Sequence, residues 1–189
     1  MKSLLSQLVK QKITVTEEQL DIILAMFKQI SVKKNKHLLE HGMIADRLFF
    51  ICKGCLRLYY QNDERANATR FMAFENTFLT SIISFVSREP TIEYIQAVEN
   101  SEVLYITHKD FSTLRKEIAG WDDLYIYILE YGLTVVNRKL SSLLTQNATE
   151  RYRSLLRNNP DLIQRLSNSN LAAYLNISPE TLSRLKSNI

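Results

Sequence analysis

The sequence predicts an α+β protein in which a β-roll of the jelly-roll type is followed by a long helix and a C-terminal helix-turn-helix. Three observations support this fold class. Short runs of β-forming residues alternate with turn signals between residues 31 and 107. An apolar repeat at helical spacing occupies residues 121–146. Two short helical patterns, three residues apart, occupy residues 169–187.

The composition is that of an ordinary globular protein. Of its 189 residues, 46% are hydrophobic and 23% are charged, and the formal net charge is +4. The first residues, MKSLLSQLVKQK, lack the apolar core of a secretory signal, and no apolar run reaches the roughly 18 residues of a membrane span. The two cysteines do not make a disulfide framework. We therefore expect a cytoplasmic protein without a membrane partner.

The first part of the chain predicts one helix and then several strands. Residues 15–30, VTEEQLDIILAMFKQI, predict an amphipathic helix capped by Thr16. The run LFFICKGCLRLYYQNDERANATRFMAF predicts strands separated by a turn at Lys53-Gly54 and a polar loop over 61–67. An apolar segment, FLTSIISFVS, follows. The runs TIEYIQAVEN and SEVLYITHKDF predict two further strands.

Residues 121–146 predict one long helix with two apolar strips. The first strip is a heptad seam formed by Ile126, Leu129, Leu133, Val136, Leu140 and Leu143. The second strip, on the first half of the helix, contains Tyr127, Ile128, Tyr131 and Val135. A helix with two buried faces needs two partners, so we expect one face on the β-roll and the seam on the same helix of a second subunit. The alternative is a single long core helix.

The stretch SNLAAYLNISPETLSRLKS predicts two helices joined by a three-residue turn. Asn176 suits the left-handed end of the first helix, Ser178 suits the N-cap of the second, and Pro179 suits its first position. Leu182 and Leu185 form the inward face. From the local pattern alone, an ordinary helical hairpin remains the alternative. Residues 148–189 contain six basic and three acidic residues, a net charge of +3 that suits an anionic partner.

The order of these elements resembles the Crp/Fnr family of transcription regulators. HGMIADRLFFICKGCLRLYY looks like the first β-roll motif of that family, with turns at Gly42 and at Lys53-Gly54. SPETLSRL is similar to its recognition helix, where a Glu-Thr-x-x-Arg pattern reads DNA. The resemblance implies a helix and a cyclic-nucleotide-binding-like sensor roll over 1–107. It also implies connecting and dimerisation helices over 108–147 and a DNA-binding helix-turn-helix over 148–189.

The resemblance also implies a homodimer that binds double-stranded DNA at a roughly palindromic site through the recognition helix, residues 178–187. The chemistry agrees, because a glutamate can accept from cytosine N4 and an arginine can donate to guanine O6 and N7. The expected DNA-contacting residues are Ser178, Pro179, Glu180, Thr181, Ser183, Arg184 and Lys186. The sequence ends at Ile189, so we expect no contribution from a wing hairpin. The alternative function is a ligand-binding or protein-interaction module without productive DNA binding.

The cyclic-nucleotide cassette of the family is altered in this chain. Thr80 and Ser81 stand at its Gly-Glu positions, and Thr91, Ile92 and Glu93 stand at its Arg-Ser-Ala positions. The chain therefore lacks a carboxylate for the ribose and a guanidinium for the phosphate, and it adds a negative charge. We do not expect cyclic AMP to bind in the family manner.

Other effectors leave little trace in the sequence. Arg88 could reach into the cassette from its loop, but this reading is the weaker one. An apolar or unfamiliar ligand among Phe78, Ile82, Ile83 and Phe85 stays open, as does a roll that binds nothing. The effector, if there is one, is an unidentified small molecule.

No cofactor, metal site or catalytic site is predicted. An iron–sulfur sensor needs about four cysteine ligands, and we interpret Cys52 and Cys55 as incidental strand residues rather than half a zinc site or a redox pair. His37 and His41 are more simply surface or hydrogen-bonded residues than metal ligands. Serine, cysteine and carboxylate arrangements typical of catalysis are also missing, so we do not expect an enzyme.

Overall fold

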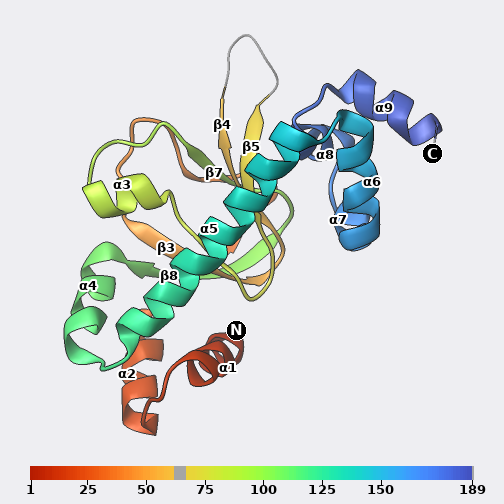
Figure 1. Cartoon of the computed structure of the whole chain (residues 1–189). Coiled ribbons are helices and arrows are strands. Elements are labelled where there is room, and N and C mark those ends of the chain that lie inside the picture. The colour runs from red at the N-terminus through yellow and green to blue at the C-terminus, as the bar shows by residue number, and fades with distance from the viewer. Residues whose placement is uncertain (62–66, 189) are drawn as a thin grey trace.

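The computed structural model describes residues 1–61 and 67–188. It contains a β-roll, a long helix that crosses one side of the roll, and a small helical unit beyond the far end of that helix (Figure 1). The predicted fold class is confirmed. The polar loop predicted over 61–67 lies largely outside the described residues.

The helices and strands follow one another as the sequence pattern predicts, with a helical start, a β region and a helical end. The helices are α1 (Lys2–Lys12), α2 (Glu17–Met26), α3 (Ile82–Ser87), α4 (His108–Glu117), α5 (Trp121–Thr145), α6 (Ala148–Asn158), α7 (Pro160–Arg165), α8 (Asn168–Leu175) and α9 (Pro179–Ser187). The strands are β1 (Lys28–Val32), β2 (His37–Leu39), β3 (Arg47–Lys53), β4 (Leu56–Tyr60), β5 (Ala68–Ala73), β6 (Phe78–Leu79), β7 (Tyr94–Ala97) and β8 (Ser101–Thr107).

The strands form two antiparallel sheets of four strands each, in the orders β1-β8-β3-β6 and β2-β7-β4-β5. The central strands β3 and β8 pair over most of their length, from Arg47 opposite Thr107 to Ile51 opposite Val103. Apolar residues from both sheets fill the space between them, among them Phe50, Ile51, Leu58, Ile95 and Leu104. The core therefore lies inside the roll, as a jelly-roll arrangement requires.

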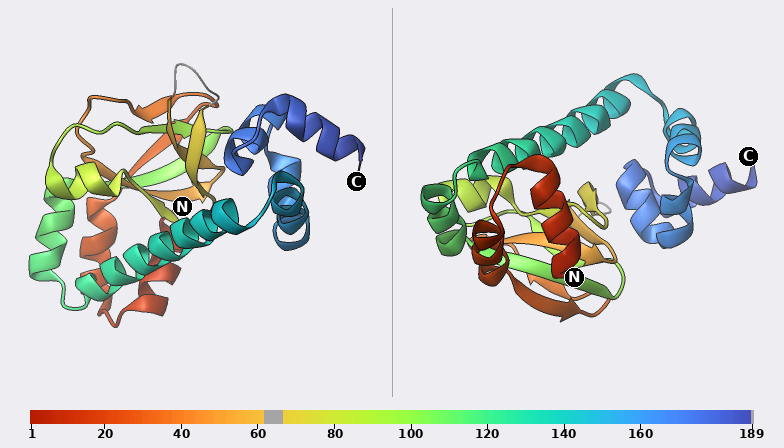
Figure 2. Two further views of the ribbon diagram at one scale, coloured as in Figure 1. Left: turned by 45° about the horizontal axis from the view of Figure 1, so that its top comes forward. Right: turned by 90° about the horizontal axis from the view of Figure 1, so that it is seen from below.

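The N-terminal region differs from the prediction in two ways. The helix predicted over 15–30 begins as expected, with Thr16 and Gln19 forming a capping box, but it ends at Met26. Residues 28–32 instead pair with β8 as an edge strand, and Phe27 is buried where the chain changes direction. A further helix, α1, precedes it and packs against β3 and α5 (Figure 2). Pairing with a distant strand is a tertiary effect that overrides the local helical pattern.

The apolar segment FLTSIISFVS contains two elements. Its first residues form the short strand β6, which pairs with β3, and the remainder forms α3. Arg88 ends this helix in the left-handed conformation, with φ 63°. The segment therefore closes one side of the roll with about one and a half helical turns, next to α4 (Figure 1), where Phe85 packs edge-on against Phe111.

Helix α5 is anchored at its start and progressively exposed along its length. Trp121 and Leu124 are fully buried, and Phe111 of α4 stacks edge-on against Trp121 and Tyr125 at centroid distances of 5.8 and 5.1 Å. Tyr127, Ile128 and Val135 then pack on the core of the roll, as the second strip predicts. The prediction of one long helix over these residues is confirmed.

The two turns of the roll that contain glycine give a matched pair of substitutions. A Cβ at Gly54 (φ +97°) would lie 2.8 Å from Cα of Ser101, whereas a Cβ at Gly42 (φ +83°) would meet no atom within 4 Å. Gly42→Ala therefore costs about 1–2 kcal/mol of left-handed strain, and Gly54→Ala costs a further ~1–3 kcal/mol of overpacking. Urea unfolding of both variants measures the difference, and equal losses would contradict this account.

Candidate nucleic-acid interface and ligand cavity

The helix-turn-helix forms as the local signals predict. Three residues separate α8 from α9, and Asn176 takes the left-handed conformation, with φ 58° and ψ 46°. The Ser178 hydroxyl accepts a hydrogen bond from the Thr181 amide at 3.2 Å, and Pro179 begins α9. Leu171, Ala172 and Leu182 are buried between the two helices. The turn is thus set by capping chemistry that the sequence carries locally.

The outer face of α9 offers fewer free groups than the sequence suggests. Glu180, Ser183 and Arg184 are exposed. Lys186 donates to the Asn168 side chain at 2.6 Å, and the half-buried Thr181 hydroxyl lies 3.1 Å from that of Ser178. Of the residues expected to contact DNA, Glu180 and Arg184 are therefore the best placed to reach base edges, because they are one helical turn apart on an open face.

Glu180 is ionised at neutral pH. Its own backbone amide and the Ser178 hydroxyl donate hydrogen bonds that lower the pKa of its carboxyl group below the ordinary value. A carboxylate accepts hydrogen bonds but cannot donate them, so this group can recognise an exocyclic amine of a base.

The altered cassette forms a closed, buried network. The Glu93 carboxylate, 2% exposed, accepts hydrogen bonds from Arg70 and from the Ser81 hydroxyl, each at 2.5 Å. The hydroxyls of Ser81 and Thr91 lie 3.0 Å apart, and the Thr91 hydroxyl accepts from the Glu93 amide at 2.9 Å. The negative charge that Glu93 adds is thus neutralised within the protein by the guanidinium of Arg70.

Arg88 points away from this network. Its guanidinium donates to the Ala45 carbonyl and to the Asp46 carboxylate, both at 2.8 Å. The weaker expectation, that Arg88 would reach into the cassette, is wrong, because the left-handed end of α3 directs this side chain to the preceding loop.

An apolar cavity of about 440 Å³ lies between the roll and α5. Three of the four residues expected to surround an apolar ligand line it, namely Phe78, Ile82 and Phe85. The fourth, Ile83, does not, since it lies on the outer side of α3 with 68% of its surface exposed. The other lining residues are Leu48, Leu58, Arg70, Phe71, Leu79, Thr80, Tyr125, Ile126, Ile128, Leu129, Glu130, Tyr131, Gly132, Leu133 and Val136.

The heptad seam of α5 is largely uncovered in the single chain. Leu133 is 63% exposed, and Ile126 and Leu140 are about half exposed. Leu129 is also exposed, whereas Val136 and Leu143 are half-buried. The two apolar strips therefore behave differently, because the second packs on the roll while Ile126, Leu129, Leu133 and Leu140 of the seam stay exposed. An exposed apolar stripe of this length is typical of an interaction surface.

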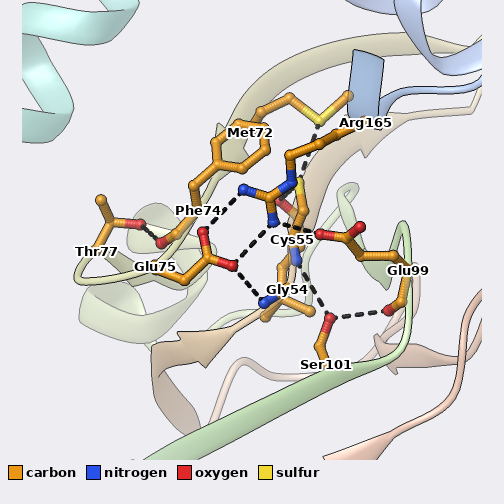
Figure 3. A network of polar contacts seen from close by, with 10 residues as sticks. Gly54, Cys55, Met72, Phe74, Glu75, Thr77, Glu99, Ser101 and Arg165 are labelled. Carbon is orange, nitrogen blue, oxygen red and sulfur yellow. Dashed lines mark hydrogen bonds and ion pairs between the residues drawn. The ribbon is translucent and has the colours of Figure 1, made fainter. Parts of the chain in front are cut away.

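The helical unit α6–α9 is fastened to the roll by an arginine between two glutamates (Figure 3). Arg165 of α7 donates two hydrogen bonds of 2.9 Å to the Glu75 carboxylate and also pairs with Glu99. Glu75 in turn accepts from the Gly54 amide at 2.7 Å. The turns after β5 and β7 thus place Glu75 and Glu99 on one guanidinium, and the turn after β3 supports Glu75. We call this arrangement the Arg165 clamp.

A second set of contacts supports the same interface. Arg57 of β4 donates to the Asn170 side chain of α8 at 2.8 Å, and Lys139 of α5 lies 4.7 Å from the ring centroid of Tyr174. Burial and nearby Arg151 lower the pKa of Lys139 to about 8. Apolar residues from both sides form one cluster, which contains Cys55, Met72, Val98, Leu155, Leu166, Leu171 and Leu175. The orientation of α8 is therefore fixed by the roll as well as by α5.

The cysteines are both buried and unpaired. Burial raises the pKa of the Cys55 thiol, which lies in the interface between the roll and the helical unit. The Tyr59 hydroxyl pairs with His37 at 2.8 Å, and His41 stacks on Tyr94. Over 1–61 and 67–188, no group of three or more His, Cys, Asp or Glu could hold a metal ion.

Comparison with known proteins agrees with this architecture. Residues 29–117 match the family model described as the cyclic nucleotide-binding domain. No curated protein matches the sequence. One similar solved structure is the c-di-GMP responsive global regulator CLP of Xanthomonas campestris. It is 18% identical, with 92% of this chain and 91% of that chain covered and a TM-score of 0.73.

Two further solved structures are similar over most of their length. FixK2 from Bradyrhizobium japonicum is 14% identical, with 86% of this chain and 83% of that chain covered and a TM-score of 0.72. A chain from Eubacterium rectale, described as a transcriptional regulator of the Crp/Fnr family, is 17% identical. The match covers 90% of this chain and 82% of that one, with a TM-score of 0.70.

The match to the cyclic nucleotide-binding domain thus spans the strands of the roll and α4. The chain as a whole has the fold of the Crp/Fnr regulators, which confirms the resemblance that the sequence motifs indicate.

The Glu93–Arg70 pair gives a direct prediction for stability. Arg70→Met leaves a buried carboxylate without its cation, and we expect a loss of about 3 kcal/mol in the free energy of unfolding. In the double variant Arg70→Met/Glu93→Gln the second substitution should recover part of that loss. Urea unfolding of the two single variants and the double variant measures the coupling. Additive effects within about 0.5 kcal/mol would show that the two residues do not act as a pair.

The Arg165 clamp predicts a pH dependence. Partial burial raises the pKa of Glu75, but hydrogen bonds from Arg165 and the Gly54 amide outweigh this effect and hold the pKa below 4.5. A carboxyl group whose pKa falls on folding stabilises the folded state above its ordinary pKa, and the contribution disappears as the pH falls.

The thermal midpoints of the wild-type protein and Arg165→Ala should therefore differ above pH 4.5 and converge as the pH falls below it. Lys10→Ala removes an exposed ion pair within the N-terminal helices and serves as the control, with little effect at any pH. A difference for Arg165→Ala that grows on acidification would contradict the assignment.

Proposed function

We propose that this protein is a homodimeric, DNA-binding transcription regulator in which α9 reads base edges of a roughly palindromic site. The outer face of α9 is the observation that carries the proposal. Ionised Glu180 and Arg184 stand one turn apart on an exposed face, while Leu182 holds the helix against α8. An acceptor and a forked donor at this spacing suit cytosine N4 and guanine O6/N7 in the major groove.

The exposed seam of α5 supports the dimer. Pairing two α5 helices through Ile126, Leu129, Leu133 and Leu140 would cover the largest apolar stripe on the described surface of this helix. A two-fold axis along this seam would place two α9 helices on one duplex, and a palindromic site follows from that symmetry.

The division of labour follows from the same arrangement. Residues 1–107 form the sensor domain, residues 108–147 connect and dimerise, and residues 148–189 bind DNA. Within 1–61 and 67–188, the structure has no helix that is long and apolar enough to cross a membrane. A regulator of this kind works in the cytoplasm and has no catalytic activity.

A second candidate function is an interaction module without productive DNA contact. The Lys186 ammonium donates to the Asn168 side chain, which leaves fewer of its N–H groups free for a phosphate and favours this reading. The salt dependence of DNA binding distinguishes the two functions. A regulator that contacts phosphates releases counterions, so its affinity falls steeply as the salt concentration rises, and its base contacts make the affinity depend on the DNA sequence.

DNA selection with the purified protein, followed by anisotropy titrations over a salt series, tests the proposal. We expect a palindromic consensus and about tenfold or greater weakening in Glu180→Ala and Arg184→Ala, with relaxed preference at the contacted base pairs. Lys109→Ala removes a positive charge from the exposed surface of α4, as Arg184→Ala does from α9, and this control variant should bind DNA normally. Weak binding with no consensus in the wild-type protein would favour the second candidate.

The dimer is tested separately by a charge in the seam. Leu133→Glu places a carboxylate on each side of the expected two-fold axis, and like charges there should convert dimers to monomers in sedimentation velocity. Val86→Glu introduces the same charge at an exposed apolar residue of α3 and should leave the dimer intact. Monomeric wild-type protein, or an equal effect of both substitutions, would contradict the role of the seam.

A further inference from the structure

We infer that the cavity between the roll and α5 binds an uncharged, largely apolar small molecule. As an effector site this inference rests on the proposed regulator, whereas the binding itself does not. A cavity of about 440 Å³ falls in the range of ligand sites in proteins, and such sites are lined mainly by apolar side chains with a few polar groups. Here the polar side chains at the wall are Arg70, Thr80, Glu130 and the two tyrosines of α5.

The charges at the cavity exclude an anionic ligand. Among the described residues of the lining Arg70 is the only cation, and its charge is already neutralised by buried Glu93 at 2.5 Å. The Ser81 hydroxyl donates to the same carboxylate, and Thr80 donates to the Arg47 carbonyl at 2.9 Å. The remaining charge in the wall is the Glu130 carboxylate, which repels anions. A ligand phosphate or carboxylate would therefore lose its hydration without gaining a partner.

The inner wall of the cavity is buried within the single chain, so a second subunit does not cover it. Phe78, Leu79 and Phe85 are 7%, 4% and 2% exposed, and they face the cavity from β6 and α3. Pairing of two α5 helices would cover the exposed Ile126 and Leu133 at its mouth. A partner helix can thus close this cavity, but the space beneath the mouth is left for a small molecule.

The position of the cavity explains how such a ligand would act. Ile126, Leu129, Leu133 and Val136 belong both to its lining and to the heptad seam. A molecule that touches these side chains changes the packing of the seam, and it shifts the dimer only if it binds one arrangement better than another. The cavity therefore couples to DNA binding through α5 itself.

Two neighbouring isoleucines provide a matched pair of variants. Ile82 lines the cavity, and Ile83 lies outside it on the exposed side of α3. The probe is the uncharged fluorophore N-phenyl-1-naphthylamine, titrated into the full-length protein. We expect saturable binding at one site per chain, weakened about tenfold or more in Ile82→Trp and unchanged within about twofold in Ile83→Trp. Circular dichroism shows whether each variant is folded.

Competition experiments test the charge of the ligand. 1-Decanol should displace the probe about tenfold better than decanoate, and 3′,5′-cyclic AMP should not displace it. In Glu93→Ala the freed guanidinium of Arg70 should favour anions, so the preference for decanol over decanoate should shrink or reverse. If Glu93→Ala fails to fold, Glu93→Gln replaces it in the experiment. This variant keeps the shape of the side chain and should shift the preference for decanol over decanoate in the same direction.

Three results would overturn the inference. They are absence of saturable probe binding, equal effects of Ile82→Trp and Ile83→Trp, and displacement by decanoate as effective as by decanol. Probe binding about tenfold tighter in a monomeric Leu140→Glu variant than in the dimer would show that a second copy fills the cavity instead, because Leu140 lies in the seam but does not line the cavity. Failure to select a DNA consensus both without a ligand and with the probe bound would refute the regulator and leave the ligand site. A DNA consensus without probe binding would refute the ligand site alone.

Discussion

The packing of α5 against the roll is the constraint on which the rest of the structure depends. Trp121 and Leu124 are inserted into the core at the start of this helix, and Phe111 stacks on Trp121 to hold the entry angle. From this anchor the helix runs across the roll to the α6–α9 unit (Figure 2). Because one apolar strip of α5 packs on the roll, the seam faces outward. Side chains of α5 also line the cavity beneath the seam. One interaction thus positions the seam, the cavity and the unit that contains α9.

The Arg165 clamp adds a second constraint to the helical unit. An unrestrained linker after Thr145 would let α8 and α9 sample many orientations relative to α5. Arg165 and Arg57 instead connect this unit to a turn and a strand of the roll, and Lys139 connects it to α5. The direct contact means that a change in the roll can reach α8 without passing through α5. Interfaces of this mixed polar and apolar kind resemble transient ones between domains.

The buried Glu93 explains how the cassette has changed its chemistry without losing its fold. A buried carboxylate is tolerated only with a cation and hydrogen bonds, and Arg70 and Ser81 provide them. The Thr91 hydroxyl accepts from the Glu93 amide and lies beside the Ser81 hydroxyl. The internal Glu93–Arg70 pair keeps the loop between α3 and β7 in place and removes the free cation that an anionic ligand would need. The neighbouring cavity is consequently apolar.

Local signals in the sequence predicted the parts of the fold that local chemistry determines. Thr16, Asn176 and Ser178 act at helix ends through hydrogen bonds only a few residues away, so their roles could be predicted.

The capping signals could not show where α2 would stop, since the strand that ends it pairs with β8 some seventy residues later, as Ser31 opposite Glu102 illustrates.

In the candidate site, too, local patterns predict some features and do not predict the long-range contacts. The residues of α9 could be named from their motif, and the α5 seam from its period. The heptad-like spacing of Leu5, Leu8 and Val9, all buried, was the signal by which α1 could have been found. The Arg165–Glu75 contact joins residues 90 positions apart, and no sequence pattern predicts such a pair.

The central claim is that α5 presents two recognition helices to successive faces of one duplex. The most direct test is the affinity for a selected palindromic duplex compared with duplexes that carry about 5 or about 10 inserted base pairs between the half-sites. The account predicts that an insertion of half a helical turn abolishes tight binding, because the second half-site moves to the opposite face of the DNA. Equal affinity for the original duplex and for the half-turn insertion would show that the protein does not read DNA as a two-fold symmetric dimer.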